Sequence, residues 1–530
     1  LTSHAGRIPF PRLRLSNAAQ NHRLHSYRFI TGSRLFSLIA SRSALALTEI
    51  YLENPSITAI RSVRVRRRLH FPLIVAVIGY GVVLFTTAVL NDADTYWHIA
   101  VGAWILEHGV VPHVDPFSFS MAGQPWVAHE WLSEVLMALA YRVGGWNGLV
   151  VFFGAAIATT AGLLARYLMR HMSLLAAAVT LTLGMSCVSP SLLARPHLLA
   201  LPVLTSWTIG LLSAEERQSR PSLYLLLLML IWANLHASFI FGLALVVPIA
   251  LDALFRASRD RWRIARRWAL FFAAALAVSL LTPHGLYGLL FPFQLTSMRH
   301  VASIGEWRPL DLPSLHPIEL AFIALLYFMV SRRMWVSAPR LLILAGLLYL
   351  AYQHRRHEML AGVVGALVLA EPIRLASRSM QEVPATHWML QPNVAVLLTG
   401  AALVTALRFA FPISRGDGPV SPVTALAAVP AQLLATPCFN SYEFGGYLIF
   451  RHVKPFIDGR ADMYGDPYMF AYLKAMRPDR ATLEALLKRY QIRWALLATD
   501  SAAAELIATL PNWRRIHVDA VAVTLVRNGS

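Results

Sequence analysis

Charged residues are scarce in this sequence of 530 residues: Asp, Glu, Lys and Arg make up 14%, while hydrophobic residues make up 56%. A soluble protein usually carries roughly 25% charged residues, so the deficit excludes an ordinary soluble protein. Apolar runs of about 14 to 22 residues recur between residues 71 and 411, and such runs are typical of membrane helices. We expect the chain to be integral to a membrane.

Cysteine is nearly absent, and so are the motifs of nucleotide and metal enzymes. The two cysteines, Cys187 and Cys438, lie far apart and give neither a metal spacing nor a disulfide framework, so we expect two buried thiols. No Walker loop, Rossmann glycine pattern, HExxH or GxSxG motif stands in a supporting context. An enzyme that works outside the cytoplasm has no nucleotide supply, so its donor should be lipid-borne or already exported.

Acidic residues are also few, which leaves a net charge of +19. Residues 1–70 hold twelve arginines and two glutamates, and they lack the apolar core of a signal peptide. We interpret this segment as a basic, disordered cytoplasmic arm. Most of the remaining positive charge lies in short loops between apolar runs, which indicates membrane topology rather than nucleic-acid binding.

The apolar runs predict a polytopic α-helical membrane domain over residues 71–412, with about eleven transmembrane helices. The arginines of residues 64–68 precede the first span and should stay inside the cell. Alternation from there places most loop arginines inside, as the positive-inside rule requires, and places the C-terminal tail outside. The predicted spans are 72–90, 148–167, 173–188, 198–213, 222–235, 238–255, 267–282, 318–331, 340–352, 358–372 and 392–411.

The outer loops, by contrast, are rich in ionisable and aromatic side chains. Charged groups beside lipid are costly, so their convergence at one face indicates an extracytoplasmic active site or a site for a polar headgroup. The long loop 283–317 is a candidate lid or acceptor platform. The outer clusters are Asp92, Asp94 and His98, then His129 and Glu130, both in the first outer loop 91–147, followed by Arg195 and His197, Asn234 and His236, His284, Glu306 and Trp307, and residues 354–357.

Two carboxylates, Asp92 and Asp94, stand two residues apart just after the first span. At this spacing they can share a divalent cation such as Mg²⁺ or Mn²⁺, or one can act as a general base while the other tunes its pKa. The alternative is a solvated helix cap at the membrane surface. The neighbours Trp97 and His98 favour a function, although tryptophan also anchors helices at the membrane interface.

Arg195, Arg355 and Arg356 lie on the outer side, against the positive-inside trend. A guanidinium matches the oxygens of a phosphate, so we expect phosphate binding, with snorkelling to lipid headgroups as the alternative. Structural roles stay open for Glu130, which opens a helix, and for Asn234, which lies in a turn. The further candidates for substrate or phosphate binding are His98, His129, Glu130, His197, Asn234 and His236.

Residues 420–530 are predicted to form a small extracytoplasmic α/β domain. Asp458, Gly459, Arg460 and Asp462 form a polar group in it, which we interpret as a turn held by Asp–Arg pairing, with acceptor binding as the alternative. Strands are expected at 437–440, 455–458, 494–498 and 516–526, and helices around 443–450, 467–475, 481–490 and 501–510.

The first outer loop contains DADTYWH, HGVVPHVDPFSF and WVAHEWL, and the tail contains FNSYEFGGYLI and FIDGRADMYG. These motifs are similar to those of a group of bacterial membrane proteins. An acidic pair directly after the first membrane helix, followed by a surface helix, resembles the C-type glycosyltransferase (GT-C) superfamily. Within it, the chain resembles the protein mannosyltransferase-like enzymes that use polyprenyl-phosphate sugars. The resemblance covers residues 72–530.

The resemblance implies an inverting transfer of a hexose or pentose from a polyprenyl-phosphate donor to a glycan, lipid or protein acceptor. The reaction would take place at the outer face of the bacterial cytoplasmic membrane. Asp92 or Asp94 would be the catalytic base, and Arg355 and Arg356, with Arg195 or a divalent ion, would stabilise the leaving phosphate.

Two points stay open. Ala93 separates the aspartates, whereas many members have adjacent acidic residues, so the identity of the base and the need for a metal are undecided. The alternative functions are a transporter or flippase of a lipid-linked or anionic substrate, and a non-catalytic protein of envelope assembly. A transporter should have repeated halves and charges near the middle of the membrane.

Overall fold

Apolar segments of the sequence form helices in the computed structural model, which describes residues 71–310, 315–377 and 394–528. These residues belong to one unit of the chain that begins at Arg66. The predicted cytoplasmic arm lies outside the described residues, and so does the beginning of the span predicted at 392–411.

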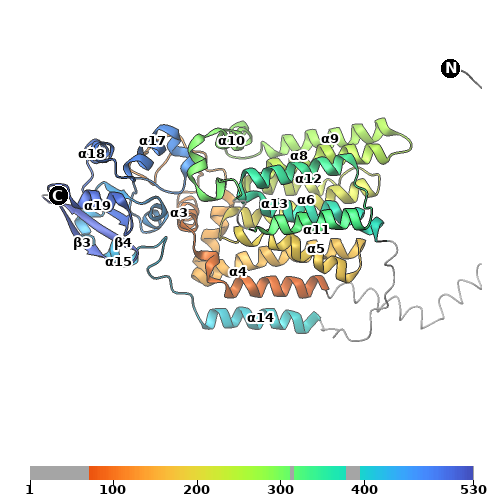
Figure 1. Ribbon diagram of the computed structural model, residues 1–530, viewed down its shortest axis with the longest axis horizontal. Coiled ribbons are helices and arrows are strands. Elements are labelled where there is room, and N and C mark those ends of the chain that lie inside the picture. Colours follow the sequence, from red (N-terminus) through yellow and green to blue (C-terminus); the bar gives the residue numbers. More distant parts are fainter. Residues whose placement is uncertain (1–70, 311–314, 378–393, 529–530) are drawn as a thin grey trace, which may run out of the picture. The chain divides into compact units, whose positions relative to one another are not determined.

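The helices over the predicted spans run side by side in a bundle (Figure 1). Their bounds are Phe71–Phe85, α4 Trp131–His171, α5 Leu174–Ser186, α6 Pro196–Glu216, α7 Tyr224–Leu235, α8 Phe239–Arg256, α9 Arg261–Ser279, α11 Pro317–Ser331, α12 Ala338–Gln353, α13 Glu358–Ala376 and α14 Val394–Ala410. The chain is a multi-pass membrane protein, because five of the described helices are long and apolar enough to cross a membrane. A count of eleven spans stays a prediction. The five are Trp131–His171, Leu174–Ser191, Pro196–Glu216, Phe239–Arg256 and Arg355–Ala376.

Helix α13 lies inside the bundle. Every residue from Glu358 to Pro372 is buried. A Cβ on Gly362 of this helix would lie 2.5 Å from the carbonyl oxygen of Gly184 in α5, so only glycine fits this contact. Close backbone approach through small residues is how helices pack in lipid, where no hydrophobic effect drives them together.

Buried ion pairs join the ends of α6, α8, α12 and α13. The guanidinium of Arg340 donates to Asp252 at 2.8 Å, to Glu215 at 3.0 Å and to Glu371 at 2.8 Å. Arg256 contacts Glu215 at 2.9 Å and Glu371 at 2.7 Å. Removing one partner from such a buried network costs about 3–5 kcal/mol, so these charges hold the four helix ends together.

Two glycines break α4 into two parts. Gly145 has a φ of 56°, a left-handed conformation that favours glycine. The part after the break contains the span predicted at 148–167. The part before it packs on α3 (Ala93–His108), because a Cβ on Gly102 would overlap the carbonyl oxygen of Glu134. Helix α10 (Leu286–Ser297) lies in the loop 283–317.

The C-terminal segment contains the expected small sheet. Strands β1 (Cys438–Asn440), β2 (Trp494–Ala498), β3 (Trp513–Val518) and β4 (Ala522–Arg527) lie in the order β1-β2-β4-β3. Strand β1 is parallel to β2, whereas β4 is antiparallel to both β2 and β3. The helices of this segment are α15 Val423–Ala427, α16 Gly445–Phe450, α17 Ala461–Ala475, α18 Arg480–Arg489 and α19 Ala502–Ala508.

Two strand predictions in this segment are wrong. Residues 455–458 form no strand, because the side chain of Asn440 takes up their backbone groups: it accepts from the N–H of Phe456 and donates to the carbonyl of Ile457, both at 2.8 Å. Residues 516–526 form a hairpin instead of one strand. The carboxylate of Asp519 accepts from two backbone N–H groups just after it, at 2.7 and 2.8 Å, and so fixes the turn.

Candidate active site

Helix α3 begins at Ala93 because Asp92 caps it, and residues 86–92 lie between it and the end of the first membrane helix at Phe85. The Asp92 carboxylate accepts from the backbone N–H of Asp94 at 2.7 Å, and aspartate is a preferred N-cap residue. Asp92 is 3% exposed, whereas the side chain of Asp94 is 15% exposed. The helix cap that the sequence allowed is thus found at Asp92, and Asp94 is the more accessible carboxylate.

The guanidinium of Arg195 holds the two aspartates. Its Nε lies 2.6 Å from Oδ2 of Asp92, and its Nη1 lies 3.1 Å from Oδ2 of Asp94. The same Nη1 is 3.0 Å from the carboxylate of Glu306. Three carboxylates from two distant parts of the sequence therefore share one arginine through charge-assisted contacts.

Arg356, in the turn between α12 and α13, completes this group. Its Nη1 lies 3.4 Å from Glu306, and its guanidinium lies 4.5 Å from the centre of the Trp307 ring, a cation–π contact. Burial alone would raise the pKa of Glu306, but Arg195 and Arg356 lower it to about 2. Glu306 therefore stays ionised and holds both arginines beside the aspartates. Arg355, the neighbour of Arg356, is exposed.

The guanidinium of Arg195 lies between these three carboxylates, where a bound metal ion would have to lie. Carboxylate oxygens are the ligands that Mg²⁺ and Mn²⁺ prefer, and Asp92 and Asp94 are the predicted pair. Over the described ranges, no group of three or more His, Cys, Asp or Glu side chains is placed to hold a metal ion. Arg195 takes up oxygens of both aspartates in this arrangement, and a divalent cation at the pair stays a prediction.

Asp94 has the environment of a general base. The indole N–H of Trp97 donates to its Oδ1 at 2.9 Å, and Oδ2 faces Arg195. Burial raises the pKa of Asp94, Arg195 lowers it and Asp92 raises it again, which gives about 7. General bases work best when their pKa lies near the working pH.

A second carboxylate, Glu130, lies among three histidines. The Nε2 atom of His236 is 3.3 Å from Oε1, that of His129 is 3.7 Å from the same oxygen, and that of His98 is 3.8 Å from Oε2. Burial raises the pKa of Glu130 to about 8; Arg356 opposes the rise. Glu130 is therefore mostly protonated at pH 7 and can donate a hydrogen bond.

Hydrogen bonds to the backbone set the tautomers of two of these rings. Nδ1 of His236 accepts from the backbone N–H of Ser238 at 3.0 Å, so its Nε2 carries the hydrogen that faces Glu130. Nδ1 of His129 donates to the carbonyl of Val127 at 3.2 Å, so its Nε2 presents a lone pair. His236 thus turns an N–H toward Glu130 from 3.3 Å, whereas His129 turns a lone pair toward it from 3.7 Å.

Two neighbouring rings on α3 connect Asp94 with Glu130. Trp97, which is bonded to Asp94, lies on His98 with ring centres 3.6 Å apart. The Nδ1 atom of His98 is 3.3 Å from Glu134, and its Nε2 faces Glu130. Asp94 and Glu130 therefore belong to one polar site.

Two other predicted residues, His197 and Asn234, form hydrogen bonds that stabilise segments next to the site. The Nε2–H of His197 donates to the carbonyl of Ser191 at 2.8 Å. Asn234 accepts from the indole N–H of Trp131 at 2.8 Å and so fixes the orientation of that ring.

The backbone of the loop after residue 457 lies in contact with the site. Arg460 contacts Asp458 at 2.7 Å and Asp115 at 2.6 Å, and all three side chains are fully buried. The predicted turn held by Asp–Arg pairing is therefore confirmed. A Cβ on Gly459, between the paired residues, would overlap Oδ1 of Asp94. Glycine lets this loop lie directly on the aspartate, because a side chain here would displace the Asp94 carboxylate.

The sequence does not identify two carboxylates of the site, Glu134 and Glu306, as candidate site residues. Glu134 is predicted only as part of the first outer loop, although its spacing of four residues from Glu130 places both on one helix face. Glu306 is predicted only as part of an outer cluster. Its partners Arg195 and Arg356 lie 111 and 50 residues away in the sequence, so no local pattern identifies it.

Neither family models nor curated protein sequences match this chain. Solved structures do match it. The oligosaccharyltransferase of Archaeoglobus fulgidus in its apo form has a TM-score of 0.54 and 11% identity, over 81% of this chain and 69% of that chain. AglB of the same organism, in complex with an inhibitory peptide and a dolichol-phosphate, has a TM-score of 0.53 and 11% identity over the same shares, 81% and 69%.

These archaeal oligosaccharyltransferases are GT-C enzymes. The chain shares the fold of these two structures. The predicted fold class, a helical GT-C-like membrane protein with a small C-terminal α/β segment, is confirmed at this level. At 11% identity the likeness concerns the fold alone, and a fold hosts many activities, so the activity has to follow from the residues of the site.

Proposed function

We propose that this protein is a membrane glycosyltransferase, which moves a sugar from a polyprenyl-phosphate donor to a glycan, lipid or protein acceptor. The reaction takes place at the outer face of the bacterial cytoplasmic membrane. The observation that carries the proposal is Asp94, a partly exposed carboxylate 3.1 Å from Arg195, with Arg356 joined to the same group through Glu306, on a GT-C fold. AglB, which has the same fold and binds a dolichol-phosphate, supports a donor of this class.

Asp94 acts as the general base. It takes the proton of the acceptor hydroxyl while that oxygen attacks the anomeric carbon of the donor sugar. The bond from this carbon to the phosphate oxygen breaks on the opposite side, so the configuration inverts and polyprenyl phosphate leaves. Asp92 is a positioning residue, since its carboxylate is engaged by the N–H of Asp94 and by Arg195.

The leaving phosphate requires a positive partner. Arg195 is surrounded by three carboxylates, which offset its charge. Arg356 contacts one of these, Glu306, at 3.4 Å, and its side chain is 21% exposed. The guanidinium of Arg356 is therefore a better partner for phosphate oxygens than that of Arg195. The exposed Arg355 on the same turn adds positive charge.

Removing the charge of Asp94 tests its role. Asp94→Asn keeps the shape of the side chain but cannot take a proton, so transfer should fall about 100- to 10,000-fold. Asp92→Asn should lower the rate less, because it disturbs the position of Arg195 but leaves the base. The measurement is sugar transfer from a polyprenyl-phosphate lipid extract by the purified full chain, with the exposed Asp500→Asn as the matched control.

Full activity in Asp94→Asn would rule out this base. A wild-type protein that moves the lipid-linked sugar across liposome membranes, yet leaves its bond to phosphate intact, would replace the proposal with the transporter alternative.

A further inference from the structure

Tyr442 of the C-terminal segment reaches the proposed base. Its hydroxyl donates to the carbonyl oxygen of Gly459 at 3.3 Å. The backbone of this glycine lies against Asp94, since a Cβ on Gly459 would overlap Oδ1 of the aspartate. The charges of Asp94, Arg195 and Glu306 all act on the Tyr442 hydroxyl. The phenol therefore faces the reaction centre, although the steps proposed above give it no role.

The fold holds Tyr442 in place before any substrate binds. The residue begins the single turn Tyr442–Phe444, which follows the end of β1. Its backbone N–H donates to the hydroxyl of Tyr472 at 2.8 Å, and the N–H of Ser441 donates to the carbonyl of Leu496 in β2 at 3.0 Å. A side chain that is ordered in advance loses little conformational entropy when it binds a partner.

The hydroxyl of Tyr442 has bonding capacity to spare. Its hydrogen bond to Gly459 is the one that the side chain makes among the described residues, and 3.3 Å is long for an O–H donor. Burial and the carboxylate of Asp94 raise the pKa of Tyr442 well above its ordinary value, so the hydroxyl keeps its proton. A phenol both donates and accepts. The half-buried Tyr442 can therefore accept from one substrate hydroxyl or turn its own hydrogen to a substrate oxygen.

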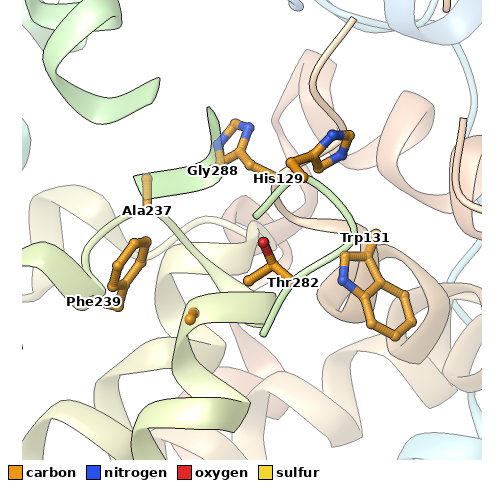
Figure 2. Close-up of a pocket in the computed structure, with 8 residues that line it drawn as sticks. His129, Trp131, Ala237, Phe239, Thr282 and Gly288 are labelled. Atoms are coloured by element: carbon orange, nitrogen blue, oxygen red, sulfur yellow. The ribbon is translucent and has the colours of Figure 1, made fainter. Parts of the chain in front are cut away.

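The other side of the polar site offers no such place to a substrate. A small pocket beside the Glu130 group is lined by His129, Trp131 and Thr282, among others (Figure 2). It has room for about one water molecule, which would bond to Oγ1 of Thr282 and Nε2 of His284, two atoms without a partner among the described residues. The pocket therefore leaves substrate recognition to the side chains around Asp94.

We propose that Tyr442 is a substrate-binding residue, whose hydroxyl forms a hydrogen bond with a hydroxyl group of the substrate beside Asp94. The inference rests on the proposed function and deepens it. The bonded hydroxyl group belongs either to the acceptor or to the donor sugar, because both meet at Asp94 during transfer. A bond at this point orients the substrate toward the base, and orientation is a large part of catalysis.

Tyr442→Phe tests the inference, because it removes the hydroxyl and keeps the ring. The measurement is sugar transfer by the purified full chain in detergent, with a polyprenyl-phosphate lipid extract as donor source and a membrane extract as acceptor source. Each extract is titrated in turn to give its apparent KM. We expect the KM for one of them to rise about 5- to 20-fold while kcat changes little. A rise for the membrane extract assigns the bond to the acceptor, and a rise for the lipid extract assigns it to the donor sugar.

Tyr468→Phe is the matched control in the same segment. The hydroxyl of Tyr468 donates to the carbonyl of Phe456 at 2.7 Å, a structural bond, so both KM values should stay as in the wild type. Thermal unfolding is recorded for each variant. Unchanged KM values in Tyr442→Phe, or a loss of activity that only follows a lower unfolding temperature, would overturn the inference while Asp94→Asn stays inactive and the proposed function stands. A wild type without any transfer would overturn the proposed function, and this inference with it.

Discussion

Asp92 and Asp94 lie two residues apart, yet the start of α3 gives them different environments. Asp92 is the cap, buried and engaged by a backbone N–H and by Arg195. Asp94 lies in the first turn, where Trp97 orients one oxygen and the side chain stays partly exposed. The position relative to the helix start therefore distinguishes the positioning residue from the proposed base.

The rate of transfer should depend on pH in two opposite ways. Asp94 must be ionised to accept a proton, and burial raises its pKa to about 7, so the rate should rise as pH rises through about 7. We also expect Glu130, which His98 and Trp97 connect to Asp94, to support the reaction only when protonated; burial raises its pKa to about 8, so the rate should fall as pH passes about 8. A pH profile of kcat/KM measures both limbs.

Glu130→Gln separates the two limbs. The amide still donates a hydrogen bond but does not titrate, so the falling limb should disappear while the rising limb stays. Glu107→Gln, at an exposed position of α3, should keep both limbs. A Glu130→Gln profile that still falls near pH 8 would assign the falling limb to another group.

The sequence predicts residues whose partners are close along the chain. The spacing of Asp92 and Asp94 is visible locally, and so is the alternative of a helix cap. The bond between Arg195 and Asp92 joins residues 103 positions apart, and the one between Arg195 and Glu306 joins residues 111 apart. The sequence predicts Arg195 as a phosphate partner from its side of the membrane, but only the fold brings the three carboxylates around it.

Among the elements, α3 is contacted directly by the backbone of the C-terminal segment at two glycines. A Cβ on Gly446 of α16 would overlap the carbonyl oxygen of Ala93, and one on Gly459 would overlap Asp94. The C-terminal segment therefore defines the space around the proposed base. This contact explains one glycine of each tail motif, Gly446 and Gly459.

Gly459→Ala should disturb catalysis more than folding. The added methyl group must displace the Asp94 carboxylate, and a misplacement of about 1 Å can lower a rate about 100-fold. Gly416→Ala is the control, since a Cβ there meets nothing within 4 Å. Transfer rates and thermal unfolding in detergent are measured for both variants. A Gly459→Ala protein that unfolds at the wild-type temperature and keeps full activity would contradict this contact.

Helices are easier to predict than strands here for a physical reason. A span in lipid must satisfy its own backbone groups, so apolar length alone indicates a helix. Residues 455–458 are similarly apolar, but the side chain of Asn440, 16 residues away, takes up their backbone. The turn at Asp519 likewise divides what the apolar pattern predicts as one strand.

On the scale of the whole described molecule, buried charges gather at opposite ends of α12. Arg340 joins its ion pairs at the beginning of this helix, and Arg356 follows its end beside Glu306. The predicted topology places the first group inside the cell and the second outside. The proposed reaction therefore takes place at the outer end of the bundle, where a lipid-linked sugar is accessible.

We propose that this protein breaks the bond between a sugar and a lipid phosphate at Asp94. The most direct measurement follows a polyprenyl-phosphate donor with a labelled sugar in liposomes that contain the purified full chain and a membrane extract as acceptor source. We predict that the wild type releases polyprenyl phosphate in step with the label that reaches the acceptor, and that Asp94→Asn releases almost none. Equal release by both proteins, or an intact donor after incubation with the wild type, would show that Asp94 is not the base of this reaction or that the protein is not a transferase.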